Sequence, residues 1–129
     1  MTKVQFILYV SDQKRSAVFY TKALGKQPVL DVPGMTEFQL SSECKLGIMP
    51  ETGIAKILKD SVPNPATGNG IPRSELYLYV ENVETSFERA LAAGAKSVSN
   101  PSLRDWGDFV AYVCDLDGHI IAFAKKQEN

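Results

Sequence analysis

The chain repeats one strand and helix segment seventy residues apart. The segments QFILYVSDQKRSAVFYTKALG at 5–25 and ELYLYVENVETSFERALAAG at 75–94 both begin with a short run of alternating side chains that ends in Val. In each, an Asp or Asn follows, and about twelve residues of helical character then run to a Gly. Asp and Asn are preferred at helix N-termini and Gly just beyond helix C-termini. The repeat predicts two copies of one module, with Gln5 and Glu75 at the same position in each.

Three more extended runs follow each predicted helix. They lie at 28–32, 35–40 and 45–49 in the first copy and at 96–99, 109–114 and 119–125 in the second. The predicted order is strand, helix, strand, strand, strand, used twice. We expect one domain over 1–129, with modules at 1–50 and 74–126. The segment 51–73 begins with a possible helix around 53–59, and its later prolines and glycines indicate a linker or flap.

The composition excludes several classes of partner. Fourteen basic and fifteen acidic residues give a net charge of -1, so the chain lacks the positive field that holds nucleic acid. No apolar run is long enough to span a membrane, and the N-terminus lacks the features of a signal peptide. We expect a cytoplasmic protein. Cys44 and Cys114 are too few for a disulfide framework and form no metal-binding pair in sequence.

Each first strand has two different faces. Phe6, Leu8 and Val10 alternate with Gln5, Ile7 and Tyr9, and the second copy repeats this with Leu76, Leu78 and Val80 against Glu75, Tyr77 and Tyr79. The aliphatic set is expected to lie under the helix. The polar and aromatic set is then left to line something else, and an aromatic pocket suits a flat or amphipathic organic molecule.

The residues 11–25 and the segment RDWGDFVAYVCDLDGHIIAF at 104–123 resemble the glyoxalase, bleomycin-resistance and extradiol-dioxygenase superfamily, also called the vicinal oxygen chelate fold. Leu116 stands where the family usually has Pro, and His119 where it usually has Asn. The resemblance implies an α+β fold in which tandem βαβββ modules form a partly closed mixed-sheet barrel around a cup-shaped site. It also implies a homodimer, since members are frequently dimers.

In metal-dependent members of the family, the first and last strands of each module supply one ligand each. The corresponding positions here are Gln5 and Glu75 on the first strands, and Ala122 and a position near Gly47 on the last strands. Ala122 cannot bind a metal, and the nearby carboxylates Glu43 and Glu51 flank the strand of Gly47. We therefore predict no metal and no other cofactor.

Glu75 is the candidate catalytic residue, because a carboxylate that faces Tyr77, Tyr79 and Trp106 could serve as a base or as an anchor for a cationic ligand. A salt bridge to Arg73 or Arg104 is the competing explanation, and the tyrosines could simply fill a barrel. His119, the only histidine, lies beside a tight turn, away from the expected cup. The candidate ligand-binding residues are Gln5, Ile7, Tyr9, Met49, Tyr77, Tyr79, Arg104, Trp106, Phe109 and Ala122.

Two functions agree with these observations. The first is metal-free binding of a small, aromatic or amphipathic organic molecule, as in bleomycin-resistance relatives. The second is a lyase or isomerase similar to lactoylglutathione lyase, which would use Gln5 and Glu75 with a weakly held divalent metal or Glu75 alone as a base. The missing ligands at Gly47 and Ala122 favour the first.

Overall fold

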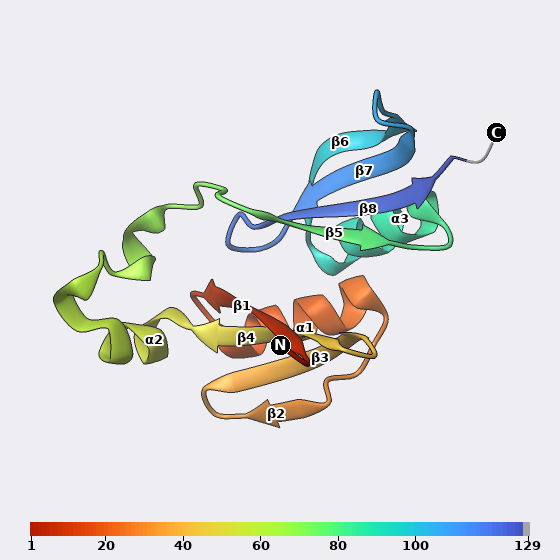
Figure 1. Ribbon diagram of the computed structural model, residues 1–129. Coiled ribbons are helices and arrows are strands. Elements are labelled where there is room, and N and C mark those ends of the chain that lie inside the picture. Colours follow the sequence, from red (N-terminus) through yellow and green to blue (C-terminus); the bar gives the residue numbers. More distant parts are fainter. Residues whose placement is uncertain (128–129) are drawn as a thin grey trace. The chain divides into compact units, whose positions relative to one another are not determined.

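The computed structural model describes residues 1–127 and contains two four-stranded mixed sheets (Figure 1). The first module comprises β1 (Val4–Val10), α1 (Gln13–Leu24), β2 (Leu30–Val32), β3 (Met35–Ser41) and β4 (Cys44–Pro50). The second comprises β5 (Glu75–Tyr79), α3 (Val83–Ala93), β6 (Lys96–Leu103), β7 (Asp108–Cys114) and β8 (Ile120–Lys126). The predicted α+β fold with two βαβββ modules is confirmed.

Both sheets have the same topology. Their strand orders are β1-β4-β3-β2 and β5-β8-β7-β6, so the first and last strands of each module are neighbours. These neighbours run parallel, and the remaining pairs are antiparallel. A parallel pair needs a long crossover connection, which the helix and two intervening strands supply. The topology therefore places Gln5 beside Lys45 and Glu75 beside Ile120.

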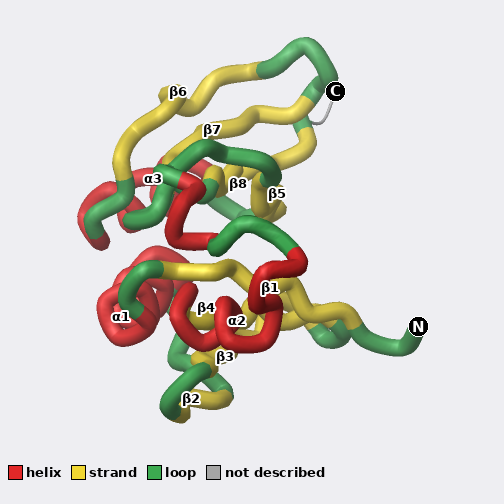
Figure 2. The backbone as a smooth tube through the Cα atoms, turned by 90° about the vertical axis from the view of Figure 1, so that its left-hand side faces the viewer, coloured by secondary structure: helices red, strands yellow, loops and turns green. Residues whose placement is uncertain are grey.

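The helix boundaries follow the capping residues of the sequence. The Asp12 side chain accepts a hydrogen bond from the Arg15 N–H, and the Asn82 side chain accepts one from the Thr85 N–H. Gly25 and Gly94 follow the last helical residues. Figure 2 shows each helix beside the strands of its own module.

Each helix covers one face of its own sheet and leaves the other face open. In the first module, Tyr20 of α1 packs on Phe38 of β3, and Leu46 and Ile48 of β4 are fully buried. In the second, Phe87 of α3 is buried, as are Ile121 and Phe123 of β8. The alternation of side chains along each strand then fixes which residues lie on the open faces.

The joining segment is more ordered than a plain linker. It forms α2 (Glu51–Leu58) and two short 3-10 helices, η1 (Lys59–Ser61) and η2 (Pro65–Gly68). By its contacts the chain divides into two compact units, and the joining segment is split between them, with residues 51–69 in the first unit and 70–73 in the second. No helix within residues 1–127 is long and apolar enough to cross a membrane.

Candidate functional site

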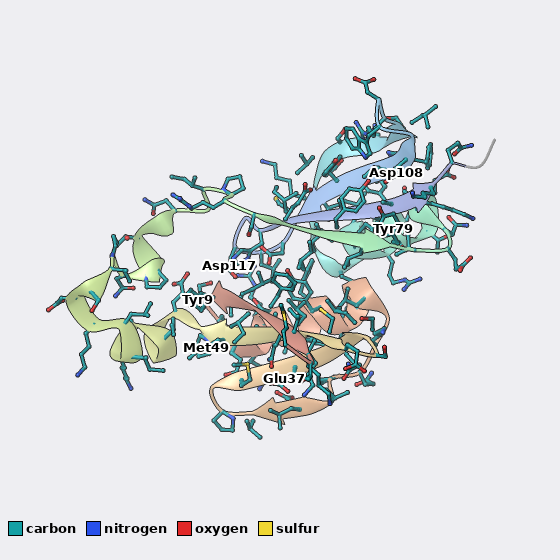
Figure 3. The ribbon with its side chains drawn as sticks, in the orientation of Figure 1. Tyr9, Glu37, Met49, Tyr79, Asp108 and Asp117 are labelled. Carbon is teal, nitrogen blue, oxygen red and sulfur yellow. The ribbon has the colours of Figure 1, made fainter. Side chains whose placement is uncertain are left out.

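The open face of the first sheet carries a group of polar side chains. Its members, which we call the first open face, are Gln5, Ile7, Tyr9, Met35, Glu37, Gln39, Lys45, Gly47 and Met49. Figure 3 shows Glu37 on β3 and Met49 on β4. Four of the predicted ligand-binding residues, Gln5, Ile7, Tyr9 and Met49, thus lie on one face of one sheet.

A hydrogen-bonded bridge crosses this face from β1 to β3. Gln5 Nε2 donates to Glu37 Oε2 at 2.8 Å, and Lys45 Nζ lies 3.2 Å from Glu37 Oε1. The Glu37 side chain is only 14% exposed, so both oxygens are held in a largely enclosed position. The hydrogen bond from Gln5 and the nearby Lys45 ammonium lower the pKa of Glu37 below its usual value, against a smaller opposing effect of burial.

Gly47 lies beneath this bridge, on the strand between the two partners. A Cβ added at Gly47 would lie 2.7 Å from Gln5 Nε2 and 3.0 Å from Met35 Sδ. A Cβ contact of 2.7 Å is essentially never seen in proteins, so the Gln5 amide occupies the space that a side chain at this position would need. The glycine at the family's ligand position is therefore what lets Gln5 reach Glu37.

The open face of the second sheet is mainly aromatic and apolar. This second open face consists of Glu75, Tyr77, Tyr79, Asp108, Val110, Tyr112, Ile120, Ala122 and Ala124. Val110, Ala122 and Ala124 are fully buried, and Tyr77 and Tyr112 pack against them. We therefore place Ala122 under the rings of this face, where they separate it from a ligand.

Tyr77 is the centre of a short hydrogen-bond chain. Its hydroxyl donates to Asp108 Oδ2 at 2.7 Å and accepts from Trp106 Nε1 at 2.9 Å. Asp108 is 6% exposed, whereas Trp106 is 58% exposed. Burial, followed by the hydrogen bond to Asp108, raises the pKa of Tyr77 to about 12.

Tyr79 extends the aromatic surface at the end of β5. Its ring meets the ring of Tyr77 edge to face, with centroids 5.3 Å apart, and the residue is 64% exposed. Figure 3 shows Tyr79 on β5 and Asp108 on β7. Together Tyr77, Tyr79 and Trp106 form an aromatic surface with one buried carboxylate behind it.

Two other predicted ligand-binding residues have different surroundings. Arg104 Nη2 donates to Ser99 Oγ, Asn100 O and Val110 O, and its guanidinium lies 5.2 Å from the centre of the Tyr112 ring. These contacts tie β6 to β7. Phe109 alternates with Asp108 and Val110 along β7, which puts it on the helix-covered face, so we leave it out of the site.

Glu75 is exposed at the start of β5. Within residues 1–127 its side chain forms no hydrogen bond or ion pair, so neither Arg73 nor Arg104 holds it in a salt bridge. The enclosed carboxylate that the sequence predicted at Glu75 is found instead at Asp108. A free carboxylate at Glu75 keeps its predicted role as a base or an anchor open to test.

His119 pairs within its own turn. Its Nδ1 lies 2.8 Å from Asp115 Oδ2, and Asp115 Oδ1 accepts from the backbone N–H groups of Asp117 and His119. Asp115 is buried, so this pair fixes the turn between β7 and β8.

The donor set does not fit the four-ligand metal site of metal-dependent relatives. Gly47 offers no side chain, Ala122 offers a methyl group, and the carboxylate nearest to Gly47 across the sheet, Glu37, is held by Gln5 and Lys45. Residues 1–127 contain no cluster of three or more His, Cys, Asp or Glu side chains placed to hold a metal ion. We therefore assign no role to a metal.

Sequence reasoning missed Glu37, Lys45 and Asp108. The prediction named only Glu43 and Glu51, which flank the strand of Gly47, whereas Glu37 lies opposite Gly47 on the next strand. Alternation along 35–40 and 45–49 put Glu37, Lys45 and Gly47 on one face, and that signal was available. Asp108 lies within the segment 104–123 that resembles the family, and nothing in the sequence indicated its burial.

The family model described as Glyoxalase/Bleomycin resistance protein/Dioxygenase superfamily matches residues 3–123. The chain belongs to this superfamily. Uncharacterized proteins of Mycobacterium bovis and Mycobacterium tuberculosis are 29% identical to it over 119 residues, which is 87% of this chain and 75% and 67% of theirs.

Solved structures of the superfamily agree with the fold. A glyoxalase-related enzyme from Fulvimarina pelagi superposes with a TM-score of 0.82 at 25% identity, over 98% of this chain and 88% of that one. A glyoxalase/bleomycin resistance protein/dioxygenase from Nocardioides gives a TM-score of 0.79 at 21% identity, over 100% of this chain and 85% of that one. The second likeness concerns the fold alone.

Proposed function

We propose that this superfamily member binds a small aromatic or amphipathic organic molecule without a metal, on the second open face. The observation that carries the proposal is the aromatic surface of Tyr77, Tyr79 and Trp106, two of which are more than half exposed. Exposed aromatic groups backed by an apolar layer are typical of sites for flat organic ligands. Ala122 supports this use of the face, because it lies under Tyr77 where a metal ligand would otherwise stand.

Gln5, Ile7, Tyr9 and Met49 of the first module remain predicted ligand-binding residues. A homodimer and a cytoplasmic location also remain predictions. The exposed edge strand β1, with Phe6 and Ile7 both more than a third exposed, supports a second copy as its cover. Light scattering that finds only a 14.2 kDa species at micromolar concentration would contradict the dimer.

The test of binding is a titration of the ¹⁵N-labelled protein with a panel of soluble flat aromatics, followed by NMR chemical shifts. We expect saturable shifts at Tyr77, Tyr79 and Trp106. Trp106→Ala should weaken binding about tenfold or more, since a tryptophan anchor typically contributes at least 2 kcal/mol. The matched control is Val98→Ala, which removes an exposed apolar side chain from β6 and should leave affinity unchanged. Equal effects of the two variants would contradict the proposal.

A lyase or isomerase similar to lactoylglutathione lyase is the second candidate. It is favoured by the exposed and unpaired carboxylate of Glu75, which is available to move a proton. The assay is isomerisation of the hemithioacetal of methylglyoxal and glutathione, with and without added nickel or zinc. Turnover by the wild-type protein that Glu75→Gln abolishes would favour this activity over binding alone.

A further inference from the structure

We propose that Tyr77 and Asp108 are positioning residues that hold the Trp106 indole as a stacking platform for a flat aromatic ring. The inference rests on the proposed function, and it adds which groups set the geometry of the site and which ligand shape they select. All four groups involved, including the neighbour Tyr79, belong to the second module.

The backbone fixes where Trp106 begins. It lies in the tight connection between β6 and β7, where Arg104 N donates to Asp108 O at 2.9 Å and Gly107 N donates to Arg104 O at 3.0 Å. A backbone held at both ends still leaves the side-chain torsions of a 58% exposed tryptophan free. The hydrogen bond from Trp106 Nε1 to the Tyr77 hydroxyl removes that freedom.

The direction of the hydrogen-bond chain follows from the chemistry of its groups. An indole N–H only donates, an ionised carboxylate only accepts, and a phenol has one proton to give. The Tyr77 hydroxyl therefore donates its hydrogen bond to Asp108, and its oxygen accepts the hydrogen bond from Trp106. Without Asp108 the hydroxyl would be free to rotate and offer its proton elsewhere, and the hold on the indole would weaken.

An exposed indole N–H has water as an alternative partner, so this bond adds little to the stability of the fold. Its effect is to fix the Trp106 ring before a ligand binds. Binding then does not have to include the entropic cost of immobilising that ring. Holding one such side chain in advance is worth about 0.5 to 1.5 kcal/mol, or roughly a twofold to tenfold gain in affinity.

The same chain limits what the platform can recognise. The only donors of Trp106 and Tyr77 are already used, so these residues offer a ligand their ring faces. The shape that such faces select is a planar ring system, because stacking depends on close contact over an area. A puckered ring of the same size and polarity should bind less well.

The first measurement uses the fact that Trp106 is the only tryptophan of the chain, so that the protein has one indole N–H resonance. Tyr77→Phe should shift this resonance and speed its exchange with solvent. Tyr79→Phe is the matched control, because it removes a neighbouring hydroxyl that forms no hydrogen bond within residues 1–127. Asp108→Ala should act as Tyr77→Phe does, whereas Asp108→Asn retains an acceptor and should restore the indole signal. An indole resonance that ignores Tyr77→Phe and Asp108→Ala, in variants whose other amide signals show a folded chain, would overturn the proposal.

The second measurement compares 2-naphthol with decahydro-2-naphthol, which share a carbon skeleton and a hydroxyl but differ in planarity. We expect the wild-type protein to prefer the planar ring, and Tyr77→Phe to weaken its binding about fivefold. Val98→Ala, which lies outside the aromatic surface, should leave the affinity unchanged. If 2-naphthol binds wild type and Tyr77→Phe equally, or binds away from Trp106, the positioning inference fails and ligand binding by the protein stands. If no flat aromatic binds at all while the indole signal responds as expected, the proposed function fails, and with it the platform's role.

Discussion

The two open faces occupy equivalent places in the repeated module but differ in their chemistry. On the first, Gln5, Glu37 and Lys45 satisfy one another across Gly47. On the second, the positions that match Gln5, Gly47 and Glu37 carry Glu75, Ala122 and Tyr112. The polar groups of the first open face bind one another, whereas the second open face presents aromatic rings to solvent.

The comparison shows that the repeated topology keeps equivalent strand positions in the two modules. A few side chains at those positions then determine the chemistry of each face. In the first module, Gly47 stands at a ligand position of the family, and the Gln5 amide uses the space above it to form a hydrogen bond with Glu37. An alanine under a tyrosine converts the other into an apolar layer. The predictions that follow try to break or sharpen this contrast.

The largest expected effect is at Gly118, in a turn that only the second module closes with glycine. Its φ is +91°, and an added Cβ would lie 2.7 Å from the Gly70 carbonyl oxygen and 2.9 Å from its Cα. Gly118→Ala should lower the free energy of unfolding by about 2 to 4 kcal/mol, since it combines backbone strain with a clash against backbone. Urea unfolding measures this change.

Gly34 is the control in the first module, because its φ is +97° but nothing lies within 4 Å of an added Cβ. Gly34→Ala should cost only about 1 kcal/mol, from backbone strain alone. If Gly34→Ala and Gly118→Ala lowered the free energy of unfolding equally, the contact between the Cβ at position 118 and the Gly70 backbone would contribute nothing to the loss of stability.

Ionisation of Tyr77 in the second module should lower the free energy of unfolding at alkaline pH. The pKa of Tyr77 rises from 10.0 to about 12 on folding, so its contribution is fully present below pH 10 and is lost as the pH rises towards 12. The loss is on the order of 2 kcal/mol for this half-buried group. Tyr77→Phe should flatten the fall in stability between about pH 9 and pH 12. The same slope in the wild type and in Tyr77→Phe would contradict the assignment.

Gly47→Ala tests the bridge of the first module. The added Cβ would displace the Gln5 amide from Glu37, and losing that bond should cost about 1 kcal/mol. In a Gln5→Ala background the 2.7 Å contact is gone and only the contacts to Met35 Sδ at 3.0 Å and Ile7 Cγ1 at 3.2 Å remain, so Gly47→Ala should cost less than it does in the wild type. A double-mutant cycle in urea measures the difference, and purely additive losses would rule out the bridge.

The smallest expected effect is the response of the first module to acid. The pKa of Glu37 is lowered on folding, so its contribution is present above the unfolded pKa near 4.5 and is lost as the pH falls through the lower folded value. Glu37→Gln should reduce the dependence of the melting temperature on pH below that pH. It should change the fall of the melting temperature above pH 9 very little. If Glu37→Gln instead removed the fall in melting temperature above pH 9, the assignment of the acid response to Glu37 and of the alkaline response to Tyr77 would be wrong.

Much of this fold could be predicted from the sequence because its signals are local. Asp12 and Asn82 mark the helix starts, and Gly25 and Gly94 lie just past the helix ends. Alternation placed Tyr77 and Tyr79 on one face together with Glu75. The family resemblance supplied the expectation of two mixed sheets, and the strand order within each sheet comes from the structure.

The sites were harder to predict, because they depend on neighbours across strands. Glu37 meets Gln5 only because β3 and β1 flank β4 at a glycine, which is a matter of register. Burial of Asp108 depends on the turn that brings it to Tyr77. Glu75 looked enclosed from its neighbours in sequence, and at the start of an edge strand it is exposed.

The central claim is that the second open face binds its ligand without a metal, in a fold whose metal ligands at Gly47 and Ala122 are gone. Elemental analysis of untagged protein, purified without chelators and dialysed, tests this claim most directly. The account predicts nickel, zinc, iron and manganese each far below one atom per chain, with 2-naphthol still bound by the same sample. About one atom of any of these metals per chain, or binding of 2-naphthol that appears only when such a metal is added, would contradict it.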